Sequence, residues 1–157
     1  MNDLVGEKVP DRKLSDAEGN LISPAQFKGK YAVLYFYPKD MTPGCTTEAC
    51  DFRDQFESFK DADAVIIGVS PDPAAKHKKF AAKYELPFYL LSDEKLELSK
   101  AMNVWQLKKN FGKEYMGIVR STYVIDPEGT IIKEWKNVRV KGHVQQALEF
   151  IQSQKKE

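Results

Sequence analysis

Cysteine is scarce in this sequence, since its 157 residues include only Cys45 and Cys50. Small secreted domains that depend on disulfides carry many more cysteines, so the chain is not a disulfide scaffold. Long apolar runs are also missing. The longest, from Tyr31 to Tyr37, falls far short of the roughly 20 residues that a helix needs to cross a bilayer. We therefore expect no transmembrane helix, and the role of the cysteines must be sought in their local surroundings.

A surplus of charge of one sign is absent as well. The 24 basic and 23 acidic residues leave a net charge of +1, and no block of like charge is long enough to indicate a nucleic-acid arm. The densest basic patch, Lys76 to Lys79, is typical of a solvated helix face. The first 14 residues lack a positive start followed by an apolar segment, so no secretory signal is visible. We expect a cytoplasmic protein with no nucleic-acid or membrane partner.

The composition that remains is that of a soluble globular protein. Hydrophobic residues make up 42% and charged residues 30% of the chain. The length fits one domain, which we expect to span residues 1–157.

One stretch combines a buried strand, a turn and a helix that begins with a cysteine. The uncharged run of residues 31–37 is typical of a strand buried on both faces. Pro38 to Gly44 then ends the strand, because proline donates no hydrogen bond to a neighbouring strand. Apolar residues at three- and four-residue steps predict an amphipathic helix from Cys45 to Phe59. Cys45 is therefore expected in the first turn of a helix, at the carboxyl end of a central strand.

The rest of the chain alternates predicted strands and helices. Such an order predicts an α/β fold with a mostly parallel sheet that has helices on its faces. The expected elements are an N-terminal β-hairpin near Lys13 and Leu21, a short helix capped by Ser23 and running to Phe27, strands at 64–70, 86–91, 121–125 and 131–135, helices at 74–84, about 93–102 and 142–154, and a long loop at 103–119.

Cys45 is a candidate nucleophile because of its place in the predicted helix. A thiol attacks as the thiolate, and a free cysteine with a pKa near 8.5 is mostly protonated at neutral pH. The first turn of a helix favours an anion through unpaired backbone N–H groups and the positive end of the macrodipole. Thr42 is close enough to place a hydroxyl near the sulfur. Arg120, which begins a predicted strand at the end of the sheet, is the candidate cation.

Cys50 limits the chemistry that the two cysteines can perform. On an ideal helix, positions 45 and 50 lie about 8.7 Å apart between Cα atoms, whereas a disulfide needs less than about 7 Å. The pair can therefore join only if the helix locally unwinds. The spacing differs from the Cys-x-x-Cys of disulfide exchangers and most zinc sites. It suits a cysteine that is oxidised to sulfenic acid and then met by a resolving partner.

These residues match a known pattern: the chain resembles a peroxiredoxin of the bacterioferritin-comigratory, or peroxiredoxin Q, type. The active-site pattern of a proline, three residues, threonine, two residues and cysteine stands here as Pro38 to Cys45. The continuation through Cys50 to Asp54 is similar to the subfamily form with a resolving cysteine five positions on. The segment from Tyr115 to Thr122 looks like the one that supplies the family's active-site arginine. A departure is Arg12 after Pro-Asp, where the family usually has an aromatic residue.

The resemblance implies a thioredoxin-like fold with an N-terminal hairpin, and it implies a role for each site residue. Cys45 would be the peroxidatic nucleophile and Cys50 the resolving cysteine. Thr42 and Arg120 would hold and polarise a hydroperoxide, and Pro38 would shield the sulfur. The reductant would be thioredoxin or a similar dithiol, with no metal, haem or flavin required. An intramolecular cysteine pair makes a dimer unnecessary, so a monomer is expected.

Structural roles are the alternatives for the same residues. Cys45 and Cys50 could be buried core thiols, Thr42 a helix cap, Arg120 a surface cation, and Pro38 the end of a strand.

Four further side chains have simple interpretations. Trp105 and Phe111 could line a substrate mouth or fill the core. His77 and His143 are expected in exposed helical positions without a metal-ligand set.

Two other functions use the same cysteines. A thiol-disulfide oxidoreductase would exchange disulfides through Cys45 and Cys50 without peroxide. A redox-sensing or binding protein would change partners when it is oxidised.

Overall fold

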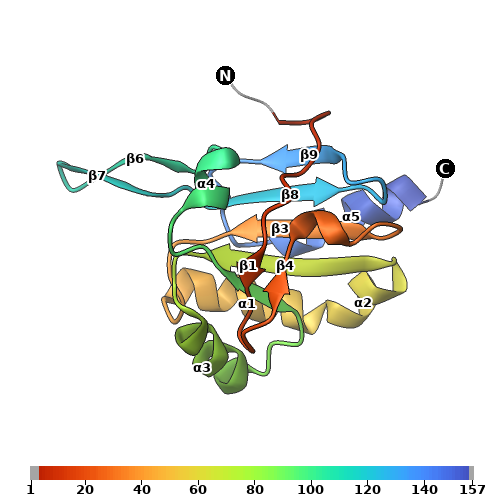
Figure 1. Cartoon of the computed structure of the whole chain (residues 1–157), viewed down its shortest axis with the longest axis horizontal. Helices are drawn as coiled ribbons and strands as arrows, with labels where there is room; N and C mark the ends of the chain where they lie inside the picture. Colours follow the sequence, from red (N-terminus) through yellow and green to blue (C-terminus); the bar gives the residue numbers. More distant parts are fainter. Residues whose placement is uncertain (1–3, 156–157) are drawn as a thin grey trace.

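A seven-stranded mixed sheet forms the centre of the molecule (Figure 1), which we describe for residues 4–155 of a computed structural model. Its strand order is β2-β1-β5-β4-β3-β8-β9, with β3, β4 and β5 parallel and the other pairings antiparallel. The strands are β1 (Leu14–Ser15), β2 (Leu21–Ile22), β3 (Tyr31–Phe36), β4 (Ala64–Ser70), β5 (Tyr89–Ser92), β8 (Ser121–Ile125) and β9 (Ile131–Trp135). The predicted α/β class is confirmed, although only three strands run parallel.

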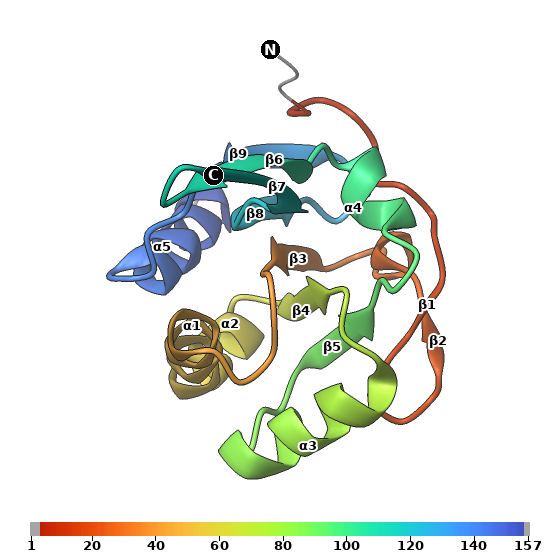
Figure 2. The same cartoon turned by 90° about the vertical axis from the view of Figure 1, so that its left-hand side faces the viewer.

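Helices cover both faces of this sheet (Figure 2). Helices α1 (Pro43–Asp54), α2 (Phe56–Asp61), α3 (Ala74–Tyr84) and α5 (His143–Lys155) bury their apolar residues in one core. Helix α4 (Glu97–Ala101) and the 3₁₀ helix η1 (Pro24–Gln26) pack into a second core on the opposite face. In the described part of the chain, no helix has the length and apolar character needed to cross a membrane.

The strongest local signals predicted their elements correctly. The bounds of β4, α3, β8 and β9 are those expected from the sequence, and the N-terminal hairpin pairs Leu14 with Ile22. Ser23 caps η1 as predicted, because its hydroxyl accepts a hydrogen bond from the backbone of Ala25 while Gln26 bonds back to the Ser23 backbone.

Three other boundaries were predicted wrongly. The helix expected at 45–59 starts two residues earlier and is broken at Gln55, whose φ and ψ of −103° and 10° leave the helical range. The strand expected at 86–91 begins only at Tyr89, after Pro87, which has no N–H to donate. The helix expected at 93–102 shortens to α4 because Leu96, at its N-terminal cap, takes a left-handed conformation.

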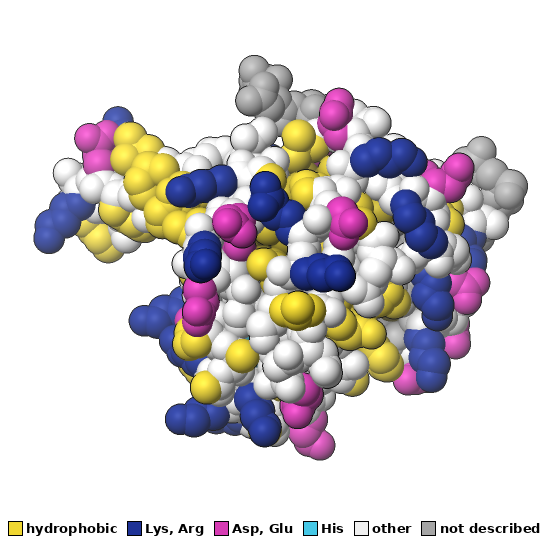
Figure 3. Space-filling model, viewed as in Figure 1, with side chains coloured by type: hydrophobic (Ala, Val, Ile, Leu, Met, Phe, Trp, Pro, Cys, Tyr) yellow, Lys and Arg dark blue, Asp and Glu magenta, His cyan; other side chains and the backbone are white. Residues whose placement is uncertain are grey.

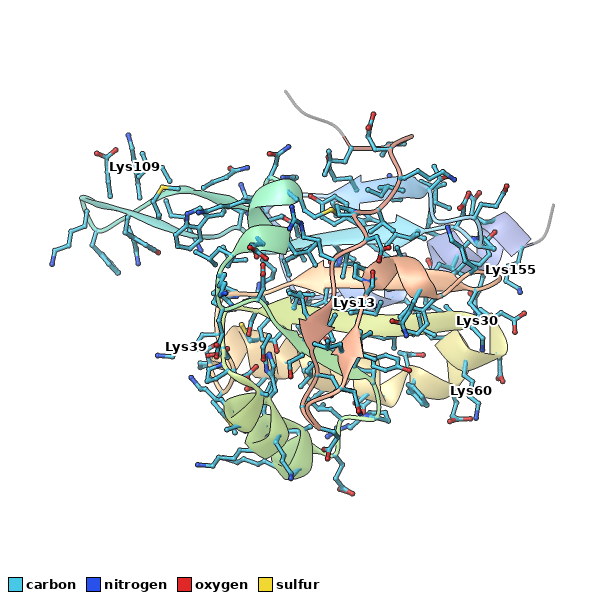
Figure 4. The ribbon with its side chains drawn as sticks, in the orientation of Figure 1. Lys13, Lys30, Lys39, Lys60, Lys109 and Lys155 are labelled. Carbon is cyan, nitrogen blue, oxygen red and sulfur yellow. The ribbon has the colours of Figure 1, made fainter. Side chains whose placement is uncertain are left out.

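The long loop expected at 103–119 is also wrong, since this segment folds into a hairpin of β6 (Trp105–Asn110) and β7 (Lys113–Ile118). Its two-residue turn, Phe111 and Gly112, has positive φ at both positions, as a type I′ turn requires. The hairpin projects from the body of the molecule, with Lys109 in its outer part (Figures 1 and 4). Hydrophobic side chains are visible along it (Figure 3).

Aromatic packing fixes α1 on the sheet. Tyr35 of β3 stacks on Phe52 of α1 with ring centroids 4.6 Å apart, and Phe52 is fully buried. Gly68 of β4 makes room for this stack, because a Cβ there would lie 2.9 Å from the Tyr35 ring. The stack at Phe52, near the C-terminal end of α1, thereby holds the helix against the carboxyl half of β3.

Candidate active site

Cys45 occupies the first turn of α1, as the sequence predicts. Thr42 is the N-cap residue, Pro43 is the first helical residue, and the N–H of Thr46 donates to the Thr42 carbonyl over 2.8 Å. The N–H groups of Gly44 and Cys45 therefore precede the first hydrogen bond of the helix and favour an anion. The Cys45 side chain is buried, with 2% of its surface exposed. A thiolate here would meet backbone dipoles rather than bulk water.

Arg120, the candidate cation named from the sequence, contacts Cys45. It lies between β7 and β8, and its Nη2 donates to Sγ of Cys45 over 3.2 Å. Its Nη1 donates to Oε1 of Glu48 over 2.6 Å, so one guanidinium links two residues of α1. Gly44 permits this approach, since a Cβ there would lie 3.3 Å from Nη2. The structural alternative of a surface cation does not hold, because the Arg120 side chain is only 17% exposed.

In the cluster of Cys45, Glu48 and Arg120, burial and neighbouring charges shift the pKa values in opposite directions. Burial raises the pKa of Glu48 to about 7, although the nearby Arg120 opposes the rise. Burial alone would lower the pKa of Arg120, but Glu48 and Cys45 together raise that pKa above its ordinary value. The guanidinium therefore stays charged beside the sulfur, while the carboxyl at its other end takes up a proton near neutral pH.

Glu48 is a site residue that reasoning from the sequence missed. Its side chain is fully buried, and its second oxygen, Oε2, has no hydrogen-bond partner. A usable signal was its position three residues after Cys45, which places both side chains on the same side of a helix. Its contact with Arg120 spans 72 positions of sequence and could not be read from local pattern.

Thr42 and Pro38 lie on the turn that leads into α1. The Thr42 hydroxyl donates to the backbone carbonyl of Lys39 over 2.9 Å. Although Thr42 is the N-cap residue, its side chain makes no capping hydrogen bond to the helix. Its oxygen can still accept a hydrogen bond from a bound peroxide. Pro38 is half-buried two residues beyond the end of β3, whereas Lys39 is exposed and points into solvent (Figure 4). The roles of Thr42 and Pro38 toward a substrate stay predictions.

Cys50 lies on the same helix as Cys45, and both are free thiols. Cys50 is half-buried while Cys45 is buried. Because α1 is continuous from Pro43 to Asp54, the separation of about 8.7 Å expected for an ideal helix applies to this conformation. A disulfide between them requires this helix to open, and the resolving role of Cys50 stays a prediction.

The two histidines were predicted wrongly as exposed. His77 is fully buried and contacts Asp40 and the Leu91 carbonyl. His143 is 3% exposed and lies 2.8 Å from the Thr122 hydroxyl through its Nε2. Burial, helped by the charge of Arg120, lowers the pKa of His143 to about 4, so this ring is neutral. Helical periodicity alone could not show that the partners of these rings come from other elements.

The two aromatic residues of the hairpin do not form the site. Phe111 is 96% exposed at the hairpin turn, so it neither fills the core nor covers Cys45. Trp105 borders a groove of about 840 Å³ between the hairpin and the end of β9, and neither Cys45 nor Arg120 lines that groove. Across residues 4–155, no three histidine, cysteine, aspartate or glutamate side chains gather as a metal-ligand set.

Comparison with known proteins gives consistent matches over nearly the whole chain. Residues 5–134 match the model of the AhpC/TSA family. The chain is 61% identical over 147 residues to Peroxiredoxin Bcp of Bacillus subtilis, which covers 94% of each sequence.

Solved structures match as well. The chain superposes on the bacterioferritin comigratory protein of Xanthomonas campestris with a TM-score of 0.90 and 38% identity, covering 97% of this chain and 99% of the other. A Xylella fastidiosa PrxQ mutant gives a TM-score of 0.92 at 31% identity, with 98% of each chain covered.

Proposed function

Because the chain belongs to the AhpC/TSA family, as a peroxiredoxin of the Bcp or peroxiredoxin Q type with a thioredoxin-like fold, we propose that Cys45 is the residue at which it reduces peroxides. Membership makes it a thiol-dependent peroxidase. The observation that supports the assignment to Cys45 is the 3.2 Å contact between its Sγ and the guanidinium of Arg120, at a helix N-terminus. Hydrogen peroxide and organic hydroperoxides are the proposed substrates.

In the first step, the Cys45 thiolate attacks the distal oxygen of the hydroperoxide. An S–O bond forms, the O–O bond breaks, and the leaving oxygen takes a proton to become water or an alcohol. Arg120 can direct its N–H groups toward the oxygen on which negative charge develops. The Thr42 oxygen accepts a hydrogen bond from the peroxide O–H, and Pro38 shields the sulfur from water. Cys45 is left as a sulfenic acid.

In the second step, Cys50 resolves this intermediate. Its thiolate attacks the sulfenic sulfur, an S–S bond forms, the S–O bond breaks, and the leaving hydroxide takes a proton to become water. Because both cysteines lie on α1, this step follows local opening of the helix. A dithiol reductant, for which we propose thioredoxin, then attacks the disulfide and restores both thiols by exchange.

The intramolecular cysteine pair bears on assembly, and the charge of the chain bears on its location. Catalysis needs no cysteine from a second copy, so we propose a monomer with one domain, residues 1–157. A cytoplasmic location, without nucleic-acid or membrane partners, agrees with the balanced charge of the chain. The Xanthomonas campestris relative is described by its alkyl peroxide reduction activity, which supports organic hydroperoxides as substrates here.

Consumption of peroxide tests the assignment. With thioredoxin, thioredoxin reductase and NADPH, the wild-type protein should turn over hydrogen peroxide and an alkyl hydroperoxide, and Cys45→Ser should not. A Cys45 reaction with peroxide no faster than that of free cysteine would contradict the proposal. Cys50→Ser should react once with peroxide and then stall, and full multiple turnover by this variant would remove the resolving role.

A further inference from the structure

The mechanism above makes no use of His77, although its ring is fully buried one turn into α3. Its Nδ1 lies 2.6 Å from Oδ2 of Asp40, and its Nε2 lies 3.0 Å from the carbonyl oxygen of Leu91. Asp40 is 1% exposed and lies in the turn between Pro38 and Thr42. A buried side chain of α3 is thus bonded directly to the turn that leads to Cys45.

The hydrogen bonds of this pair fix the number of its protons. A carbonyl oxygen can only accept, so Nε2 of His77 carries a hydrogen. The Tyr37 hydroxyl donates to Oδ1 of Asp40 over 2.6 Å. One further proton must then lie between Nδ1 and Oδ2, on the ring of His77 or on the carboxyl of Asp40. Every polar atom of the two side chains is paired, as buried polar groups require.

The backbone of the turn is anchored separately. The N–H of Asp40 donates to Oδ2 of Asp72 over 2.7 Å, and the same oxygen accepts from the Ser70 hydroxyl over 2.7 Å. The next residue, Met41, has a φ of 70°, which is a strained value for a side chain of its size. Strain of this kind persists only where the surroundings fix the backbone. The contacts of Asp40 provide that restraint, with Pro43 and α1 following directly.

The contacts of Asp40 join the Cys45 end of α1 to other parts of the fold. The helix begins three residues after Asp40, which is bonded to Tyr37 just after β3, to α3 and to the loop after β4. The far end of α1 is held by other contacts, because Phe52 stacks on Tyr35. The Cys45 end therefore depends on the contacts of Asp40 for its position.

We propose that His77 is a positioning residue of the peroxidase reaction, which through Asp40 fixes the turn of residues 38–42 and the Cys45 end of α1, and with them the placement of Cys45 against Arg120. This inference rests on the proposed role of Cys45 in the peroxide reaction.

Hydrogen exchange tests the anchoring of the turn. We expect the amides of Asp40 and Thr46 to exchange at least about tenfold faster in His77→Phe than in the reduced wild-type protein, because the turn loses the side-chain bond that holds Asp40. Equal exchange in the two proteins would overturn the proposal. This measurement does not depend on the chemistry of Cys45 or Cys50.

Substitutions test the positioning role. His77→Phe keeps a ring but removes both hydrogen bonds, and it should slow the first oxidation of Cys45 by roughly tenfold or more. Asp40→Asn can accept from Tyr37 and donate to a neutral His77, so it should stay within about threefold of wild type. Ile131→Ala, in the core on the other face of the sheet, is the control for a general loss of stability. The rate is measured by quenched flow, alkylation and mass spectrometry of Cys45.

The outcomes separate this proposal from the function it extends. If His77→Phe and Ile131→Ala oxidise Cys45 at equal rates, His77 has only a structural role and the proposal is wrong. Should His77→Phe not fold, Asp40→Ala takes its place in the same comparison with Asp40→Asn. Failure of Cys45 in the wild-type protein to react with peroxide would instead count against the proposed function.

Discussion

Arg120 makes the two contacts that distinguish Cys45 from a thiol that is merely buried. Its guanidinium bonds the sulfur through Nη2 and the Glu48 carboxyl through Nη1. A planar fork with several donors can hold both groups at once, which a single ammonium cannot. At the scale of single residues, the reactivity of the site therefore depends on the shape of this cation as well as on its charge.

Arg120→Lys should test that dependence. The charge is kept, but one ammonium cannot reproduce both bonds, so the rate constant for Cys45 oxidation should fall about 10²-fold. The measurement is stopped-flow or quenched-flow reaction of the reduced protein with hydrogen peroxide. Arg139→Lys, at an exposed position, is the matched control and should leave the rate unchanged. Equal rates for the two variants would show that the guanidinium geometry is unimportant.

Gly44→Ala separates catalysis from stability at a neighbouring position. The added Cβ would lie 3.3 Å from Nη2 of Arg120, so the guanidinium must shift away from the sulfur. Alanine favours a helix over glycine, so the free energy of unfolding should not decrease. We expect a rate of peroxide reaction about tenfold lower with unchanged or higher stability. A variant with the wild-type rate would show that this close approach does not matter.

The elements differ in how firmly they are held, and the contrast is greatest between α1 and the β6–β7 hairpin. Helix α1 buries Phe52 against Tyr35, Phe59 and Phe88. The hairpin leaves Leu107 57% and Phe111 96% exposed. Packing on the sheet therefore stabilises α1, whereas the outer hairpin contributes little to the core.

Paired substitutions of phenylalanine measure this difference. Phe111→Ser should change the free energy of unfolding by no more than about 0.5 kcal/mol, because the side chain is already exposed. Phe52→Ala should lower it by about 3–5 kcal/mol, since it removes a buried aromatic ring. Denaturant titration of both variants gives the values. A large loss for Phe111→Ser would mean that the hairpin turn packs against another part of the protein in solution.

Elements with strong local signals could be predicted, and those set by distant contacts could not. The Asp-Pro-Glu-Gly turn signal between two strand-like segments predicted β8 and β9. The hairpin at 105–118 was missed because its turn residues, Phe111 and Gly112, are an uncommon pair for two positive φ values. The break at Gln55 was missed because the apolar spacing of the sequence continues across it.

The same limit applies to the site. Pro38, Thr42 and Cys45 lie within eight residues and could be grouped by pattern. Arg120 was a candidate from its place at the start of a predicted strand, and the family resemblance gave it a role. The bond between Asp40 and His77 spans 37 positions. Burial of an ionisable side chain depends on such a distant partner, which is why the sequence predicted the wrong environment for His77.

At the scale of the whole molecule, one buried carboxyl links stability to pH. The folded pKa of Glu48 is raised to about 7 from an ordinary value of 4.5. The folded state therefore binds more protons than the unfolded state between these values, and this contribution to stability falls as pH rises from about 4.5 through about 7. A shift of this size corresponds to roughly 3 kcal/mol.

Glu48→Gln should remove that pH dependence. We expect the free energy of unfolding of the variant minus that of wild type to increase by up to about 3 kcal/mol from pH 5 to pH 8, because only the wild type loses stability over this range. Urea titrations at a series of pH values measure this difference. A difference that does not vary with pH would show that the buried carboxyl titrates as it does in the unfolded chain.

The central claim is that Cys45 and Cys50 of one chain form the oxidised state of the peroxidase. Equal amounts of unlabelled and ¹⁵N-labelled reduced protein should be mixed, treated with one equivalent of hydrogen peroxide, digested and measured by mass spectrometry. Cleavage of the backbone between Cys45 and Cys50 places the two cysteines on separate peptides, which remain joined only where a disulfide links them. The account predicts Cys45 to Cys50 disulfides that are wholly unlabelled or wholly labelled. Mixed-isotope disulfides, or Cys45 oxidised without a bond to Cys50, would contradict it.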